Sequence, residues 1–175
     1  MLGDEQTWSR WDHITGEAFA GPLDGHRLES WPIRHTTVAA MAAERPDLRV
    51  HVSDFKSLGS RFMTALNGRK IDRGSFLPPP FYKSMSQPID PRLPKLANGL
   101  GVIVEDVGRY YPMAALADPV QEPWGDRVLT VALGAVDGVP RATWADGSEP
   151  MQLFTRWYGF SFTWPGCSIY GQSLG

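Results

Sequence analysis

The sequence predicts an α+β fold, a single β-rich domain with a largely antiparallel sheet and one or two short helices. Fifteen prolines and eighteen glycines among 175 residues favour many short elements over a helical bundle. The C-terminal half consists of apolar runs of strand length separated by turn signals. The clearest of these signals is Asp137-Gly138, and we expect residues 127–136 and 139–145 to pair around it as an antiparallel hairpin.

The first part of the chain is predicted to be a meander of short strands. Residues 7–11 and 17–20 have the β-branched and aromatic content of strands, and a turn containing Gly16 connects them. Residues 27–33 alternate polar and apolar side chains, but Pro32 cannot donate a ladder hydrogen bond. This third stretch is therefore expected to be an edge strand at best.

The pattern then changes to a helical one. Thr36 or Thr37 can cap residues 38–44, which are almost entirely apolar and alanine-rich, and Pro46 ends the helix. Residues 48–52 alternate polar and apolar side chains, which predicts a strand after the helix. Residues 77–94 carry six prolines and should form an extended connection within the single domain 1–175.

The remaining elements are predicted as strands and one short helical turn. Residues 100–104 are a nearly continuous apolar run, and Val107-Gly108 is expected to reverse the chain into a strand at 109–111. Pro112 at a first helical position opens a turn over residues 113–116. Residues 151–157 form the last expected strand.

Composition limits the functional classes. Lys and Arg number 17 against 19 Asp and Glu, and the formal charge of −2 argues against a nucleic-acid binder. One cysteine excludes an internal disulfide framework. No apolar run reaches the ~18 residues of a membrane span and no signal peptide is recognised, so a soluble chain, cytoplasmic by default, is expected.

Several runs of residues resemble the uncharacterised bacterial and archaeal domain-of-unknown-function family 3179. The first block keeps its small residues and its tryptophan in register over some twenty positions: Asp4, Thr7, Ser9, Trp11, Thr15-Gly16-Glu17-Ala18, Gly21-Pro22-Leu23 and Gly25. Further similar runs are His35-Thr36-Thr37, Arg45-Pro46-Asp47, Ile89-Asp90-Pro91-Arg92-Leu93-Pro94, Gly101-Val102 and Tyr111-Pro112. The aromatic C-terminus around Trp157 and Phe160 fits more loosely.

The resemblance implies a fold and no activity, and it is expected to cover only the latter part of the family's domain. Members usually begin with a longer half that holds a Cys-Pro-Leu-Cys-like segment, whereas Cys167 is the only cysteine here. A further departure is His13, where a glutamine is expected. Thiol or metal chemistry of fuller members is therefore not carried over to this chain.

Recognised catalytic and metal patterns do not occur in the sequence. His13, His26, His35 and His51 lack the i, i+4 spacing of a helical zinc pair, so no metal and no cofactor are predicted. A Gly-x-Ser-x-Gly nucleophile elbow is also absent. Cys167 has no adjacent base and is interpreted as a small buried or half-buried residue.

The most informative polar pair is Asp90 and Arg92. These residues flank Pro91, whose ring fixes φ, so both side chains extend from a stiff backbone. Arg92 could bind a carboxylate or phosphate bidentately, or it could pair with a nearby acid and hold the long connection in place. The aromatic series that contains Trp157 could line an apolar pocket or belong to the core.

Two functions of different classes follow from these residues. The first is a non-catalytic ligand-binding or protein-interaction module with a Trp-rich surface. The second is an enzyme or metal-dependent redox domain in which His13, His35, Asp90 and Arg92 converge on a pocket. The candidate ligand-binding residues are, in chain order, Trp11, His13, His35, Asp90, Arg92 and Trp157.

We also expect the chain to associate, as a homodimer or with a separate N-terminal partner, and a small molecule is a further candidate ligand. The argument is that residues 7–11 form an interior strand that has lost a neighbour. Trp8 and Trp11 are three residues apart and would face opposite sides of that strand. At least one indole would then lack cover. No nucleic-acid or membrane partner is expected.

Overall fold

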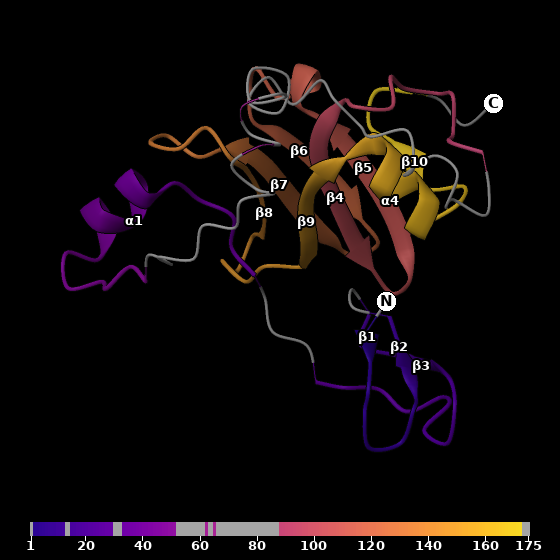
Figure 1. The fold of residues 1–175 in the computed structure, drawn as a ribbon. Coiled ribbons are helices and arrows are strands. Elements are labelled where there is room, and N and C mark those ends of the chain that lie inside the picture. Colours follow the sequence, from indigo (N-terminus) through magenta and orange to yellow (C-terminus); the bar gives the residue numbers. More distant parts are fainter. Residues whose placement is uncertain are drawn as a thin grey trace. The chain divides into compact units, whose positions relative to one another are not determined.

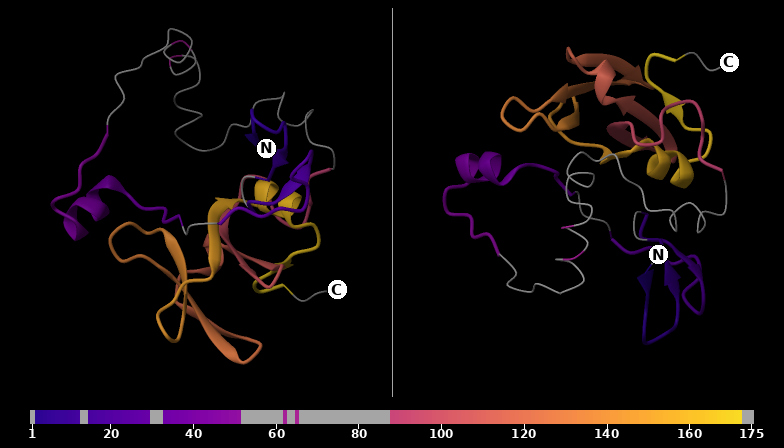
Figure 2. Two further views of the ribbon diagram at one scale, coloured as in Figure 1. Left: turned by 90° about the horizontal axis from the view of Figure 1, so that it is seen from below. Right: turned by 45° about the horizontal axis from the view of Figure 1, so that its top comes forward.

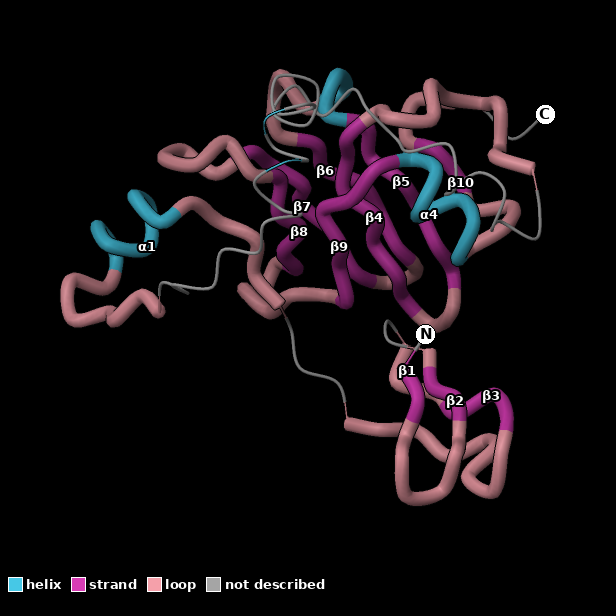
Figure 3. The backbone as a smooth tube through the Cα atoms, in the orientation of Figure 1, coloured by secondary structure: helices cyan, strands magenta, loops and turns pink. Residues whose placement is uncertain are grey.

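The computed structural model describes residues 2–12, 15–29, 33–51 and 88–172, together with the single positions 62 and 65. The chain divides into two compact units, Met1–Arg34 and His35–Gly175. Strands dominate both units and run largely antiparallel, and the α-helices are short (Figures 1 and 3). The predicted α+β class is therefore confirmed, whereas the boundaries of the single domain 1–175 stay a prediction.

The N-terminal unit is a three-stranded antiparallel sheet. Its strands are β1 (Leu2–Gly3), β2 (Arg10–Trp11) and β3 (Ala18–Ala20), in the order β1-β2-β3. The strand predicted over residues 7–11 is thus confined to its last two residues, and residues 5–7 form a turn. Because β2 pairs on both sides, the argument that this strand has lost a neighbour is wrong.

One close backbone contact explains a glycine in the first family block. Gly21 has a φ of +99°, and a Cβ at that position would lie 2.7 Å from the Cα of Ser9. Only glycine accommodates both the conformation and the contact. Of the edge strand predicted over residues 27–33, the described residues 27–29 and 33 form one antiparallel bridge, between Arg27 and Glu17, and residues 30–32 lie outside the described part.

Helix α1 spans Val38–Glu44. The hydroxyl of Thr37 accepts a hydrogen bond from the backbone N–H of Ala40 at 3.1 Å, so the predicted cap is confirmed. Residues 48–51, by contrast, form no strand, and the prediction there is wrong. The N–H of Leu48 instead bonds the carbonyl of Arg45 in a turn, at 3.0 Å.

The C-terminal unit is built on two packed sheets. The four-stranded sheet has the order β10-β5-β4-β9, with β10 (Ser168–Ile169), β5 (Val107–Pro112), β4 (Asn98–Val104) and β9 (Met151–Arg156). The three-stranded sheet has the order β6-β7-β8, with β6 (Val120–Trp124), β7 (Arg127–Leu133) and β8 (Pro140–Trp144). All pairings are antiparallel except that of β10 with β5.

The hairpin around Asp137-Gly138 is confirmed, with a longer loop than predicted. The last pair joins Leu133 to Pro140, so residues 134–139 form the connection. The carboxylate of Asp137 accepts hydrogen bonds from the N–H of Val139 at 3.1 Å and the hydroxyl of Thr36 at 2.7 Å. This carboxylate also pairs with Arg141, so the loop is organised around one acidic side chain.

The first hairpin of this unit reverses two residues earlier than predicted. Glu105 and Asp106 both have positive φ, +49° and +67°, which is the geometry of a tight turn that follows strand twist. Val107 and Gly108 therefore belong to β5 rather than to the turn. The turn predicted after Pro112 is present as the 3-10 helix η1 (Met113–Ala115).

The four-stranded sheet packs against other elements on both faces, and its side chains alternate between the two faces. Leu100, Val102 and Tyr111 face β6–β8 in one core cluster, whose remaining buried members are Leu116, Val120, Leu129, Val131, Ala142 and Trp144. The opposite face carries Ile103 and Tyr110. There helix α4 (Trp157–Thr163) covers the sheet with Trp157 and Phe160 (Figure 2).

Helix α4 was not predicted. Its sequence, Trp-Tyr-Gly-Phe-Ser-Phe-Thr, is rich in aromatic residues that are enriched in strands. Burial of Trp157 and Phe160, each at most 1% exposed, outweighs that preference because a large buried side chain contributes about 1.5–3 kcal/mol. Of the proline-rich connection, residues 77–87 lie outside the described part, and residues 88–97 contain no helix or strand. No helix in the described residues has the length and apolar character to cross a membrane.

Candidate functional site

Asp90, Arg92 and Trp157, which were predicted as candidate site residues, come together at the start of α4. The guanidinium of Arg92 donates from Nε at 2.9 Å and from NH2 at 2.7 Å to Oδ2 of Asp90. Its central carbon lies 5.4 Å from the centre of the Trp157 ring. The indole N–H of Trp157 donates to the carbonyl of Asp90 at 2.8 Å.

These contacts favour one of the two interpretations of Arg92. The hydrogen bonds from Arg92 hold the pKa of Asp90 below its ordinary value, so the pair is ionised at neutral pH. Because Trp157 is fully buried and bonds the backbone of residue 90, the pair holds the segment before β4 against α4. The arrangement agrees with the interpretation that Arg92 pairs with a nearby acid and holds the proline-rich connection in place.

Cys167 lies beside this pair and belongs to the same core cluster as Trp157. Burial raises the pKa of its thiol, and hydrogen bonding and charge from Arg92 only partly oppose that rise. A nucleophilic thiol requires a lowered pKa. The interpretation of Cys167 as a small buried residue therefore agrees with its surroundings.

A second arginine–tryptophan pair lies between the sheets and was not predicted. NH1 of Arg109 is 2.8 Å from Oε2 of Glu122, and its central carbon is 5.1 Å from the ring centre of Trp124. The other carboxylate oxygen of Glu122 accepts from the indole N–H of Trp124 at 2.8 Å and from the hydroxyl of Tyr111. Nε of Arg109 donates to Ser168 at 2.9 Å.

This network joins three strands around one carboxylate. Tyr111 is completely buried, and burial raises the pKa of its phenol, with the Glu122 hydrogen bond acting in the same direction. The phenol therefore remains protonated and donates to Glu122. Both oxygens of that carboxylate are thus used within the protein, which fits a structural link between β5, β6 and β10.

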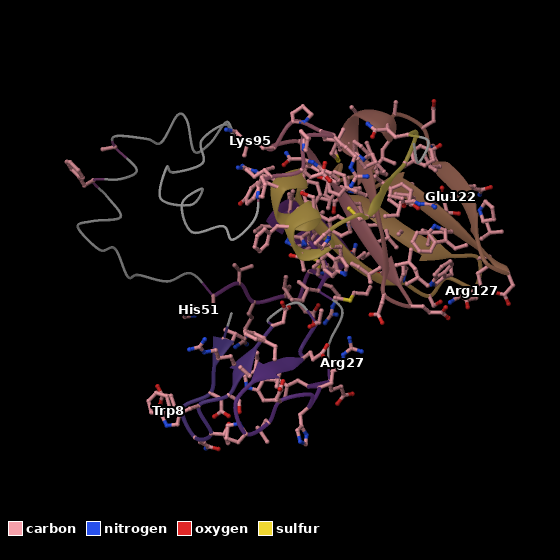
Figure 4. All side chains as sticks on the ribbon, turned by 90° about the vertical axis from the view of Figure 1, so that its right-hand side faces the viewer. Trp8, Arg27, His51, Lys95, Glu122 and Arg127 are labelled. Atoms are coloured by element: carbon pink, nitrogen blue, oxygen red, sulfur yellow. The ribbon has the colours of Figure 1, made fainter. Side chains whose placement is uncertain are left out.

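A third pair follows the same scheme on the surface of the β7–β8 hairpin. The central carbon of Arg127 lies 4.0 Å from the ring centre of Trp144, and NH2 of Arg127 is 3.3 Å from Oδ2 of Asp146. Leu129 pairs with Trp144, so Arg127 occupies the diagonal position on the same face of the ladder. Figure 4 labels Arg127 and Glu122, which belong to two of these clusters.

The N-terminal unit presents a tryptophan with a different environment. Residues 4–9, which we call the Trp8 loop, are closed by hydrogen bonds from Asp4 N to Ser9 O at 3.0 Å and from Trp8 N to Asp4 O at 2.9 Å. Trp8 is 82% exposed and has a φ of +58°. Its side chain projects outward from the unit (Figure 4).

The interior of the Trp8 loop is densely hydrogen-bonded. The carboxylate of Asp4 accepts from the N–H groups of Gln6 at 2.8 Å and Thr7 at 3.3 Å and from the hydroxyl of Thr7. These bonds hold the pKa of Asp4 below its ordinary value. Ser9 is fully buried and accepts from the N–H of Leu23 at 3.2 Å. The loop is therefore a formed structure that holds Trp8 outward.

The family described as "Protein of unknown function (DUF3179)" matches residues 1–149. The chain belongs to this family. The matched residues include the Trp8 loop, Asp90 and Arg92, whereas Trp157, Phe160 and Cys167 lie beyond them. No curated protein and no solved structure matches this DUF3179 chain.

Two of the other predicted site residues of this DUF3179 chain, Trp11 and His35, have described surroundings of their own. Trp11 is buried in the N-terminal unit, at 8% exposure. The ring of His35 meets Phe154 edge-on, with centroids 6.2 Å apart. His13 lies outside the described residues. A binding role for these residues, and a pocket formed by them, stays a prediction.

Among the described residues of the DUF3179 chain, no group of three or more His, Cys, Asp or Glu side chains could hold a metal ion. The tryptophans there are largely interior, since Trp11, Trp144 and Trp157 are buried and Trp124 is partly buried. Trp8 is the single tryptophan of the described residues that is mostly exposed. The Trp-rich surface therefore stays a prediction, and Trp8 is its exposed member among the described residues.

Thr7 and Trp8 are predicted to lie in a strand, so the Trp8 loop does not follow from that prediction. The relevant signal is in the sequence, since Asp4, Thr7 and Ser9 are residues whose side chains bond nearby backbone and form turns. The Arg109–Trp124 and Arg127–Trp144 pairs, in contrast, join residues from different strands. Arg109 and Ser168 are 59 positions apart, and no local pattern indicates their contact.

Proposed function

We propose that this DUF3179 chain is a non-catalytic protein-interaction module and that Trp8 is its principal contact residue. One observation carries the proposal: a large aromatic side chain stands 82% exposed on a loop whose own backbone and polar groups are hydrogen-bonded. A tryptophan in this position buries little surface within its own chain. Its burial by another molecule would contribute about 1.5–3 kcal/mol.

The backbone of Trp8 strengthens this proposal. A φ of +58° is left-handed, and this conformation costs a residue with a Cβ roughly 1–2 kcal/mol. Glycine and asparagine tolerate it far better. A bulky residue that strains the backbone and gains few contacts at the same position is favoured by something other than the stability of the chain.

Two acids of the C-terminal unit, Glu122 and Asp90, support a binding role over a catalytic one. Glu122 uses both carboxylate oxygens for Arg109, Trp124 and Tyr111. Asp90 is held by the guanidinium and backbone N–H of Arg92. Groups committed to such partners are poorly suited to accept or donate a proton during a reaction.

Self-association is the simplest form of this interaction and is the one we propose. A homodimer would cover Trp8 on both copies at once, because a two-fold interface repeats each contact and Trp8 of each copy can meet a different residue of the other. Sedimentation equilibrium across a concentration series tests it. We expect a monomer–dimer equilibrium for the natural chain and a monomer for Trp8→Ala and Trp8→Asn.

Val136→Ala is the matched control, since Val136 is 74% exposed on the β7–β8 loop. Its equilibrium should equal that of the natural chain. A natural chain that is monomeric at high micromolar concentration contradicts self-association. An equally strong dimer in both Trp8 variants contradicts the role of Trp8.

A further inference from the structure

Three tryptophans of the C-terminal unit share one arrangement, in which an arginine covers the ring and a carboxylate holds the arginine. The ring-to-guanidinium distances are 5.4, 5.1 and 4.0 Å. The corresponding nitrogen-to-oxygen distances of the ion pairs are 2.7, 2.8 and 3.3 Å. The three clusters are Arg92–Trp157–Asp90, Arg109–Trp124–Glu122 and Arg127–Trp144–Asp146.

Trp8 has two of these three components. Its ring is exposed, and the carboxylates of Asp4 and Glu5 belong to the same hydrogen-bonded loop. Asp4 is held in its charged form by the loop, and Glu5 is exposed. Within the described residues of the N-terminal unit, no arginine is recorded over the Trp8 ring.

We propose that the Trp8 loop binds the guanidinium group of an arginine on the interacting partner, with the indole beneath it and the exposed carboxylate of Glu5 beside it. This inference rests on the proposed interaction function and specifies the chemistry of its partner. A cation over the face of a tryptophan is attracted by the ring quadrupole, and arginine additionally stacks its planar group.

The charge of the surrounding unit favours a cationic partner. Residues 1–34 carry six carboxylates against three arginines, whereas the whole chain has a formal charge of only −2. An apolar partner side chain would bring no charge to neutralise Glu5. A guanidinium meets both the aromatic face and the adjacent acids.

Arginine is favoured over lysine because its planar group can stack on the ring while its edge donates to a carboxylate. Both contacts are made at once in the three clusters of the C-terminal unit. An ammonium group is compact and strongly hydrated, so it stacks less well on an indole.

The test is a titration of the natural chain, at a concentration where it is monomeric, with N-acetyl-arginine methylamide. The indole N–H signals are followed by proton–nitrogen correlation NMR, and Trp8→Phe identifies the Trp8 signal. N-acetyl-citrulline methylamide is the neutral control of the same shape, and N-acetyl-lysine methylamide compares the two cations.

We expect the Trp8 signal to shift progressively with the arginine compound and to reach saturation. The shift should be at least twofold smaller with the lysine compound and absent with the citrulline compound. Glu5→Gln should reduce the shift at a given concentration, and added salt should reduce it further. Arg127→Ala should leave it unchanged, since that arginine belongs to the Trp144 cluster.

Equal shifts with arginine and citrulline, or no shift of the Trp8 signal, overturn the inference. This outcome is separable from the proposed function, because self-association is measured without any added compound. A chain that dimerises through Trp8 but ignores the arginine compound has the proposed function with a different partner chemistry. A chain that binds the arginine compound and never dimerises retains the inference and loses the homodimer.

Discussion

Phe160 of α4 packs its ring directly on Gly101 of β4, so that a Cβ on Gly101 would lie 2.0 Å from Cε2 of the phenylalanine. The adjacent Gly99 provides similar room, since a Cβ there would lie 2.6 Å from the ring of Tyr110. Glycines at alternate positions of a central strand weaken it locally. Here they let the rings of Phe160 and Tyr110, both in the second core cluster, lie directly against β4.

The first prediction concerns this contact. Gly101→Ala should lower the free energy of unfolding by about 1–3 kcal/mol, because the added methyl group overlaps a buried ring. Denaturant unfolding monitored by tryptophan fluorescence measures it. Gly159→Ala in α4 is the matched control, since its Cβ has only Thr155 Oγ1 nearby at 3.5 Å.

Gly159→Ala should leave stability unchanged or raise it by up to about 1 kcal/mol, because alanine favours a helix over glycine. A Gly101→Ala variant as stable as the natural chain would show that α4 does not lie on β4 as described. Restoration of stability in Gly101→Ala/Phe160→Leu would tie the loss to that ring.

The second prediction separates the stability of Trp8 from its role. Trp8→Gly should raise the free energy of unfolding of the chain by about 0.5–1 kcal/mol, because glycine adopts the left-handed φ without strain. The larger entropy that glycine loses on folding offsets part of this gain. Trp8→Asn should raise the free energy of unfolding by less. Thermal unfolding of the three proteins provides the comparison, and a clear loss of stability in Trp8→Gly would argue that the indole packs within its own chain.

The third prediction concerns the pH dependence of the Asp90–Arg92 pair. The pKa of Asp90 is lowered in the folded chain from an ordinary value of 3.8, chiefly by the Arg92 hydrogen bond. A lowered pKa contributes stability above the ordinary value and loses it as pH falls through the folded value. Arg92→Ala should therefore cost about 1 kcal/mol at pH 7 and progressively less below about pH 4.

Denaturant unfolding at pH 7, 5 and 3 measures this difference between Arg92→Ala and the natural chain. Arg45→Ala is a control for an exposed ion pair, because Arg45 and Asp47 are joined at 3.6 Å on the surface. Its cost should be near zero at every pH. A cost for Arg92→Ala that is constant from pH 7 to pH 3 would assign its effect to packing on Trp157 rather than to the ion pair.

The fourth prediction concerns the edge of β8. The side-chain amide of Gln152 on β9 accepts from the N–H of Ala142 at 2.7 Å and donates to its carbonyl at 3.1 Å. Gln152→Ala leaves both backbone groups without this partner and should cost about 1–2 kcal/mol. Gln152→Glu restores only the acceptor, so its cost should be intermediate in the same unfolding assay. Equal stability of all three proteins would exclude this link between the sheets.

Local patterns were sufficient for much of the fold. The hairpin around Asp137-Gly138 and the helix capped by Thr37 are both encoded within a few residues, and both are present. Helix α4 could not be predicted in this way, because its residues favour a strand until Trp157 and Phe160 are buried against β4. The strand predicted over residues 48–52 is absent from its described residues 48–51 for the converse reason. An alternating pattern forms a stable strand only where a neighbouring strand pairs with it.

In the candidate site as well, local contacts could be predicted and contacts between distant segments could not. The contact of Asp90 with Arg92 is local, and the pairing of Arg92 with a nearby acid is one of the two outcomes that the sequence predicts. The Glu122 network joins side chains of β5, β6 and β10, and it depends on a topology that the sequence does not display. His35 meets Phe154 rather than Asp90 because Thr36 is bonded to the β7–β8 loop.

The most direct measurement of the central claim is fluorine NMR of the chain labelled with 5-fluorotryptophan, recorded from low to high micromolar concentration. Trp8→Phe identifies the Trp8 signal, and the interior Trp144 and Trp157 are internal references. If Trp8 is the contact residue of a self-associating module, its signal shifts with concentration toward a buried environment, and the signals of those two references stay in place. A Trp8 signal that is unchanged across the whole range, while sedimentation detects a dimer, would contradict the account.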